Sequence, residues 1–142
     1  MIIRPEREQD IDAITAITVE AFKTMEISPH TEQFIIHALR KSGNLALSLV
    51  AEKDGQVVGH IAFSPVTVAD GSQGWYGVGP LSVSPEFQKQ GIGTALMKKG
   101  LSLLKEMNGK GCLLVGDPKY YIRFNFKNIP DLILEGVPQQ VF

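Results

Sequence analysis

The residues with the clearest chemical potential form a short glycine-containing loop at positions 84–93. This loop reads SPEFQKQGIG and lies between an apolar run that ends at Val83 and a helical pattern that begins at Ile92. N–H groups at the start of a helix attract anions, and Gly91 and Gly93 let the backbone close around a phosphate without a Cβ clash. Lys89 adds a nearby cation. The pattern predicts a phosphate-binding loop, although a tight turn without a ligand explains the glycines alone equally well.

Two common nucleotide-binding patterns do not fit this loop. A Walker A loop carries Lys and then Ser or Thr after its last glycine, whereas Thr94 follows Gly93 directly. A dinucleotide-binding loop needs a third glycine at the position that Leu96 occupies. The loop therefore indicates a phosphate-containing ligand of another kind.

The helices that position this loop are predicted from apolar residues at helical spacing. Two amphipathic patterns, at residues 10–22 and 34–39, precede it, and the strongest pattern, at residues 92–107, follows it directly. A short helix over residues 118–124 is expected downstream, with Asp117 as its N-cap and Pro118 at its first position.

The predicted strands cover residues 1–4, 47–51, 57–63, 75–83, 112–115 and 132–134. Asp54-Gly55 is a strong hairpin signal between the second and third of these strands. The strand over residues 75–83 contains Gly77, Gly79 and Pro80, which are unusual in a central strand. A strand that is interrupted at a fixed point and followed by a glycine-containing loop suggests a binding cleft.

The order of elements predicts one α/β domain over residues 1–142. Two helices, three successive strands, a helix and a further strand imply a mixed, mostly antiparallel central sheet with helices on both faces. The chain carries a formal net charge of −1 and 44% hydrophobic residues, as soluble globular proteins do. The small net charge argues against a nucleic-acid partner, and no apolar run is long enough to span a membrane, so we expect a cytoplasmic protein. The single cysteine, Cys112, lies in an apolar run and is expected to be a buried structural thiol.

Residues 81–96, which read LSVSPEFQKQGIGTAL, resemble the acetyl-CoA signature of the GCN5-related N-acetyltransferase (GNAT) superfamily. That signature is an apolar strand followed by V-x-P-x-x-[QR]-x-x-G-[IV]-G-x-x-L, and every position matches. Residues 116–126 resemble the second signature of the superfamily, which contains a tyrosine and a hydrophobic-Gly-Phe ending. The opening Ile3-Arg4-Pro5 fits as well, so the resemblance covers nearly the whole chain in the right order.

The resemblance implies that acetyl-CoA is the cofactor and that its diphosphate is bound by the backbone N–H groups of residues 88–94. The preceding strand would pair with the pantetheine arm and would splay away from the parallel strand over residues 112–115, and no metal is implied. The implied cofactor-binding residues are Leu81, Ser82, Val83, Gln88, Lys89, Gln90, Gly91, Ile92, Gly93, Thr94, Asp117 and Tyr120.

The implied reaction is direct attack of a primary amine on the acetyl thioester. A backbone N–H near Val83 would stabilise the oxyanion, and Tyr121 aligns with the tyrosine that protonates the departing thiolate in many relatives. Tyr121 as a packing residue is the alternative interpretation. The general base stays open, because residues 77–83 contain no carboxylate and His60 is more often a satisfied polar residue than a base.

The acceptor is a small-molecule amine or a peptide, since the residues expected to line its site, 22–40, do not select one amine class. A non-catalytic acyl-CoA-binding sensor is the alternative function.

Two positions depart from the superfamily pattern. Asn125 replaces the usual glycine of the second signature, and asparagine tolerates a left-handed backbone better than other non-glycine residues. Residues 137–142 hold only the expected start of the final strand, so either the final strand is truncated or residues 132–134 lie at an open apolar edge. An open apolar edge invites pairing with another chain, which predicts a homodimer through this end.

Overall fold

The fold is described by a computed structural model for residues 1–23, 32–66 and 74–114. The predicted helix at residues 118–124, the strand at 132–134 and the dimerisation end therefore lie outside the described residues. The helices and strands predicted for the described residues are confirmed to within three residues at each element boundary. The elements, in chain order, are β1 (Ile2–Pro5), η1 (Glu8–Asp10), α1 (Ile11–Phe22), α2 (Glu32–Ser42), β2 (Leu47–Lys53), β3 (Gln56–Pro65), β4 (Trp75–Val83), η2 (Pro85–Phe87), α3 (Ile92–Glu106) and β5 (Gly111–Leu114).

The strands form a five-stranded sheet in the order β1-β2-β3-β4-β5. The pairs from β1 to β4 are antiparallel, and β4 and β5 are parallel. Parallel neighbours need a crossover connection, and α3 supplies it between β4 and β5. The mixed, mostly antiparallel sheet predicted from the sequence is thus confirmed.

The hairpin between β2 and β3 follows from its two turn residues. Asp54 and Gly55 both have positive φ angles, 52° and 78°. A two-residue turn of this kind matches the right-handed twist of the flanking strands, and Asp-Gly is one of its favoured sequences. The hairpin lies at the end of the sheet where β4 ends, and the start of β3 pairs there with the end of β4.

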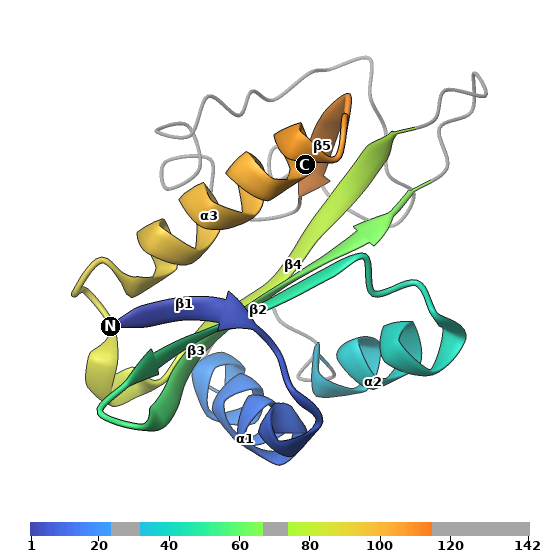
Figure 1. The fold of residues 1–142 in the computed structure, drawn as a ribbon. Coiled ribbons are helices and arrows are strands. Elements are labelled where there is room, and N and C mark those ends of the chain that lie inside the picture. Colours follow the sequence, from blue (N-terminus) through green and yellow to red (C-terminus); the bar gives the residue numbers. More distant parts are fainter. Residues whose placement is uncertain (24–31, 67–73, 115–142) are drawn as a thin grey trace.

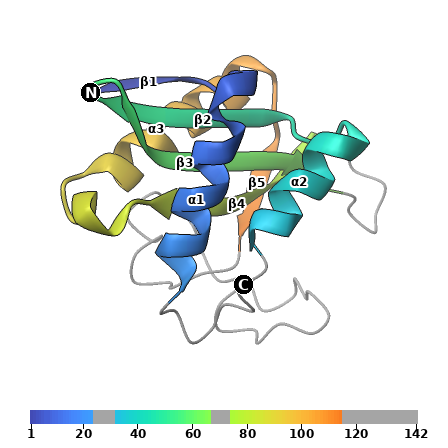
Figure 2. The same ribbon diagram turned by 90° about the horizontal axis from the view of Figure 1, so that it is seen from below.

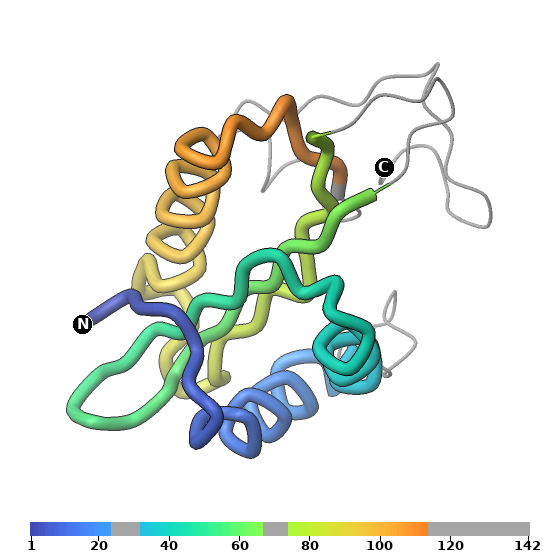
Figure 3. The backbone as a smooth tube through the Cα atoms, turned by 45° about the vertical axis from the view of Figure 1, so that its right-hand side comes forward, coloured from blue at the N-terminus to red at the C-terminus, as the bar shows by residue number. Residues whose placement is uncertain are grey.

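The helices cover both faces of the sheet. In Figure 2, α1 and α2 lie in front of the sheet and α3 lies behind it, and Figure 3 shows the same three layers from the side. Ile14 of α1, Ile36 of α2 and Val50 of β2 form a small buried cluster on the first face. The apolar stripe predicted for α1 therefore faces the sheet. The stripe predicted for α2 does not, because Ile36 is the residue buried against the sheet while Phe34 and Ile35 are exposed.

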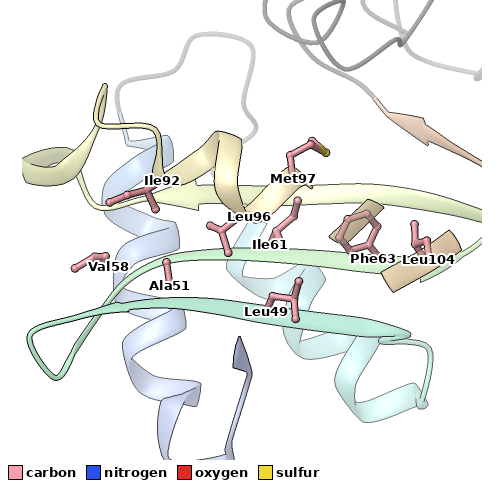
Figure 4. Packing of buried hydrophobic residues seen from close by; sticks show 9 residues of the cluster. All are labelled: Leu49, Ala51, Val58, Ile61, Phe63, Ile92, Leu96, Met97 and Leu104. Atoms are coloured by element: carbon pink, nitrogen blue, oxygen red, sulfur yellow. The ribbon is translucent and has the colours of Figure 1, made fainter. Parts of the chain in front are cut away.

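The larger core lies between α3 and the sheet (Figure 4). Phe63 of β3 is completely buried there, and a Cβ added to Gly100 of α3 would lie 2.4 Å from its ring. Such a contact is impossible without movement, so a residue without a side chain allows α3 to pack closely on the sheet. Leu49, Ala51, Val58, Ile61, Ile92, Leu96, Met97 and Leu104 complete the cluster. This packing fixes the start of α3 relative to the end of β4.

Candidate acetyl-CoA-binding site

The predicted phosphate loop connects β4 to α3. Gly91 is the N-cap of α3 and has a φ of 86°, which favours glycine, and Lys89 also has a positive φ of 63°. The first backbone hydrogen bond of the helix runs from the Ala95 N–H to the Gly91 carbonyl at 3.0 Å. The N–H groups of the first turn of an α-helix have no carbonyl within the helix to which they can donate. The first turn of α3 therefore presents backbone donors at the positive end of the helix dipole.

The loop is held by contacts at both of its ends. The Phe87 N–H donates to the Ser84 carbonyl at 2.8 Å, and the Gln88 side-chain amide donates to the Val83 carbonyl at 3.1 Å. The Ile92 side chain is buried in the core beneath α3. Ile92 is thus an anchor, and only its backbone is available to a ligand. The side chains of Gln88, Lys89 and Gln90 are exposed.

The orientation of the backbone at the end of β4 follows from one hydrogen bond. The Ser84 N–H donates to the Val58 carbonyl of β3 at 2.8 Å. In an antiparallel pair, facing residues alternate between those that exchange both hydrogen bonds and those that exchange none. Ser82 faces His60, and this pair lies two positions along each strand from the pair of Ser84 and Val58. The backbone groups of Ser82 therefore point to β3.

By the same alternation, the backbone groups of Leu81 and Val83 point to the opposite edge of β4. The bond from the Gln88 amide to the Val83 carbonyl reaches that edge and supports the assignment. The Ser82 side chain is buried, and its hydroxyl donates to the Thr18 hydroxyl of α1 at 3.4 Å. Ser82 thus holds its two neighbours in register and directs neither its side chain nor its backbone to that edge.

The edge at Leu81 and Val83 is not covered by β5 within the described residues. β5 pairs with β4 only from Trp75–Gly111 to Val78–Leu114. Figure 1 shows β5 beside the beginning of β4 and not beside its end. The pairing of β4 with β3 also changes register at Gly79 and Pro80. The predicted interruption of this strand is found, whereas its predicted separation from the next parallel strand concerns residues beyond Leu114, which lie outside the described part of the chain.

A partly buried polar cluster lies on the α1 and α2 face of the sheet. Arg40 of α2 donates to Glu6 through two nitrogens, at 2.9 Å and 3.0 Å. The Ser48 hydroxyl contacts both Glu6 and His60 Nε2, the latter at 2.7 Å, and His60 is completely buried. Sequence reasoning missed this cluster, because its members come from four separate elements and follow no motif.

The charges in this cluster fix the tautomer of His60. Burial raises the pKa of the Glu6 carboxyl, but the hydrogen bonds from Arg40 and Ser48 outweigh that effect and bring it below its usual value. The ionised Glu6 takes the single hydroxyl proton of Ser48, so the Ser48 oxygen accepts from His60 Nε2–H. His60 Nδ1 then carries no proton, and it has no hydrogen-bond partner among the described residues. Burial lowers the pKa of His60 to about 4, with a smaller lowering effect from Arg40 that the Glu6 charge opposes.

Three of the predicted site residues, Asp117, Tyr120 and Tyr121, lie outside the described residues. Among the described residues, no group of three or more His, Cys, Asp or Glu side chains could hold a metal ion. No helix in the described ranges is long and apolar enough to cross a membrane. Cys112 is partly buried instead of fully buried as expected, and this burial raises the pKa of its thiol to about 11.

Comparison with known proteins shows the family to which this chain belongs. The model of the acetyltransferase (GNAT) family matches residues 11–118. The Escherichia coli K12 protein named uncharacterized N-acetyltransferase YhbS is 38% identical over 128 residues, which cover 89% of this chain and 74% of that protein. A crystal structure of YhbS in complex with CoA has a TM-score of 0.81 and covers 89% of this chain and 68% of that chain.

A second solved structure is more similar in sequence. The GNAT family acetyltransferase from Brucella melitensis, crystallised in complex with acetyl-CoA, is 50% identical and has a TM-score of 0.86. The match covers 89% of this chain and 82% of that chain. The family model matches most of the chain, and relatives of this similarity are N-acetyltransferases by name, so the chain belongs to the GNAT family of acetyltransferases.

Proposed function

We propose that this protein is an N-acetyltransferase that binds acetyl-CoA and transfers its acetyl group to a primary amine by direct attack. The observation that carries the proposal is the continuity of two binding features. The backbone edge at Leu81 and Val83, which no strand covers among the described residues, leads directly into the N-terminus of α3. A long ligand with amide groups at one end and phosphates at the other would contact both at once.

The described residues fit such a ligand. The pantetheine arm has amide groups, which would pair with the outward backbone groups of Leu81 and Val83 as an added strand does. The diphosphate would lie against the backbone of residues 88–94, where the helix dipole favours negative charge. An added Cβ at Gly91 meets no atom within 4 Å, so the cap stands in open space where a ligand can approach the backbone.

The proposed chemistry needs three actions. The amine nitrogen forms a bond to the thioester carbon, the carbon–sulfur bond breaks, and the sulfur leaves as a thiolate. A backbone N–H near Val83 would stabilise the negative charge on the carbonyl oxygen, an effect worth about 3 kcal/mol for one well-placed donor. The Tyr121 hydroxyl would donate its proton to the thiolate, by resemblance to relatives.

The amine must also lose a proton, and the strand beside the thioester has no carboxylate. His60 does not suit this role in the described structure, because Ser48 occupies its Nε2 and its side chain has no exposed surface. The amine would therefore reach the site in its neutral form or release its proton to water. Activity that rises with pH toward the pKa of the chosen amine would support this route.

The acceptor would approach α1 and α2. Phe34 and Ile35 of α2 are exposed by 62% and 46%. An amine with an apolar neighbouring group would match this surface, and both small amines and peptides satisfy that condition.

The experiment has a binding arm and a transfer arm. Calorimetric titration with acetyl-CoA is expected to show one site. The charge reversal Lys89→Glu should weaken the affinity for acetyl-CoA several-fold. Lys105→Glu, near the far end of α3, is the matched control and should bind normally. Release of free thiol is then followed with polyamines, aminoglycosides and peptides. Absence of binding by the wild type would disprove the proposal, whereas tight binding without any transfer would favour an acyl-CoA sensor.

A further inference from the structure

We infer that Lys53, at the end of β2, is a further phosphate-binding residue of the cofactor site. The inference rests on the proposed function and adds to it a cation that comes from outside the loop. In sequence, Lys53 precedes Gln90 by 37 positions. The fold brings the two residues together.

The β2–β3 hairpin lies against the phosphate loop because β3 runs beside the end of β4. The Ser84 N–H, at the start of the loop, donates to the Val58 carbonyl of β3. Lys53 is the last residue of β2, directly before the tight Asp54–Gly55 turn. The short turn keeps Lys53 at the same end of the sheet as the loop.

Two contacts connect the Lys53 ammonium to the loop. Its Nζ donates to the Gln90 side-chain oxygen at 3.4 Å and lies 5.5 Å from the centre of the Phe87 ring. The Phe87 contact is within the range of a cation–π interaction. Gln90 directly precedes Gly91, the N-cap of α3. The ammonium is therefore held beside the point where the backbone donors of the helix begin.

The charge of Lys53 is not neutralised by an acid among the described residues. No carboxylate forms an ion pair with it there, and the neighbouring acid Glu52 is paired with Arg4 at 3.0 Å. Its contacts with Gln90 and Phe87 both involve neutral groups. An ammonium has three donors and here uses one of them on a long hydrogen bond. Such a cation next to a helix N-terminus raises the local positive potential.

A phosphate oxygen of coenzyme A would accept a hydrogen bond from Lys53 Nζ in place of, or beside, the Gln90 oxygen. Both the diphosphate and the 3′-phosphate of the ligand have this chemistry. A partly exposed ion pair contributes up to about 1 kcal/mol, which corresponds to roughly fivefold in affinity.

The test is the binding of CoA to the intact chain, which needs no acceptor amine. Lys53→Met should weaken CoA roughly fivefold, while Lys53→Arg should restore most of the affinity and Lys105→Met should have no effect. Thermal unfolding of all variants should match the wild type, since the side chain is partly exposed. The same titrations with dephospho-CoA, which lacks the 3′-phosphate, identify the phosphate that Lys53 contacts. If Lys53→Met weakens dephospho-CoA as much as CoA, the contact is to the diphosphate; if it does not weaken dephospho-CoA, the contact is to the 3′-phosphate.

Two results would overturn the inference. Unchanged CoA affinity of Lys53→Met would mean that the ammonium does not meet a phosphate. An equal loss in Gln90→Ala, with no further loss in the double variant, would mean that Lys53 acts only by bracing the loop. Failure of the wild type to bind CoA would instead disprove the proposed function itself, so the two failures are distinguishable.

Discussion

His60 Nε2 and the Ser48 hydroxyl lie 2.7 Å apart on the sheet face covered by α1 and α2, and the same hydroxyl contacts the ionised Glu6. Because Glu6 also accepts two hydrogen bonds from Arg40, the cluster ties the segment after β1 and the helix α2 to the centre of the sheet. Burial keeps His60 neutral despite the nearby Glu6 charge, and this has consequences for stability.

Stability is expected to fall as the pH is lowered from about 6.5 towards 4. The folded pKa of His60, about 4, lies below its unfolded value, so protons favour the unfolded chain in this window. The full effect would reach about 3 kcal/mol. His60→Gln should remove the pH dependence of urea unfolding between pH 6.5 and 5, whereas His37→Gln should retain it. An unchanged slope in His60→Gln would contradict the assignment.

Ser48→Ala should destabilise the protein by roughly 1–3 kcal/mol, because it leaves His60 Nε2–H buried without an acceptor. Urea unfolding at pH 7 measures this change. Ser102→Ala, on the exposed side of α3, is the matched control and should be neutral or slightly stabilising. Equal stability of the two variants would show that the Ser48 hydroxyl is not needed.

Gly100→Ala should cost about 1–3 kcal/mol of stability, because the new methyl group would meet the Phe63 ring at 2.4 Å. The double variant with Phe63→Leu should cost less than the sum of the two single changes, since the smaller side chain makes room. Thermal or urea unfolding of the four proteins measures this coupling. Strict additivity would indicate that α3 shifts away from β3 instead.

Val83→Pro should weaken acetyl-CoA binding more than it weakens the fold. The Val83 N–H points away from β3, so a proline there removes no hydrogen bond of the sheet but removes a donor proposed for the ligand. Ser82→Pro removes a bond to β3 and should unfold the chain much more readily. Calorimetry and thermal unfolding together distinguish the two effects. Normal acetyl-CoA binding by Val83→Pro would disprove the strand-edge contact.

Tyr121→Phe should lower the turnover of acetyl-CoA with an amine while leaving the affinity for acetyl-CoA nearly unchanged, because the hydroxyl would act on the departing thiolate. A loss of about 100-fold is typical of a positioned proton donor. Steady-state kinetics with the best acceptor of the panel measures this change, and Tyr120→Phe is the natural comparison. A fully active Tyr121→Phe protein would eliminate the acid role.

The local sequence determined the elements and the loop. Apolar residues at helical spacing place α1, α2 and α3, Asp54-Gly55 places the hairpin, and Gly91 places the turn between β4 and α3. These features depend on interactions between residues close in the chain, so the order of residue types suffices to predict them. The interruption of β4 at Gly79 and Pro80 is predicted for the same reason, since these residue types are themselves unusual in a central strand.

Only the tertiary structure decided which backbone groups face the ligand and which charged groups meet. The outward direction of Leu81 and Val83 depends on the register with β3, and a shift of one residue would have turned Ser82 outward instead. Glu6 meets Ser48, and Lys53 meets Gln90, across separations of 42 and 37 residues. No local pattern contains such pairings, because sheet order and helix packing bring these side chains together only after the chain has folded.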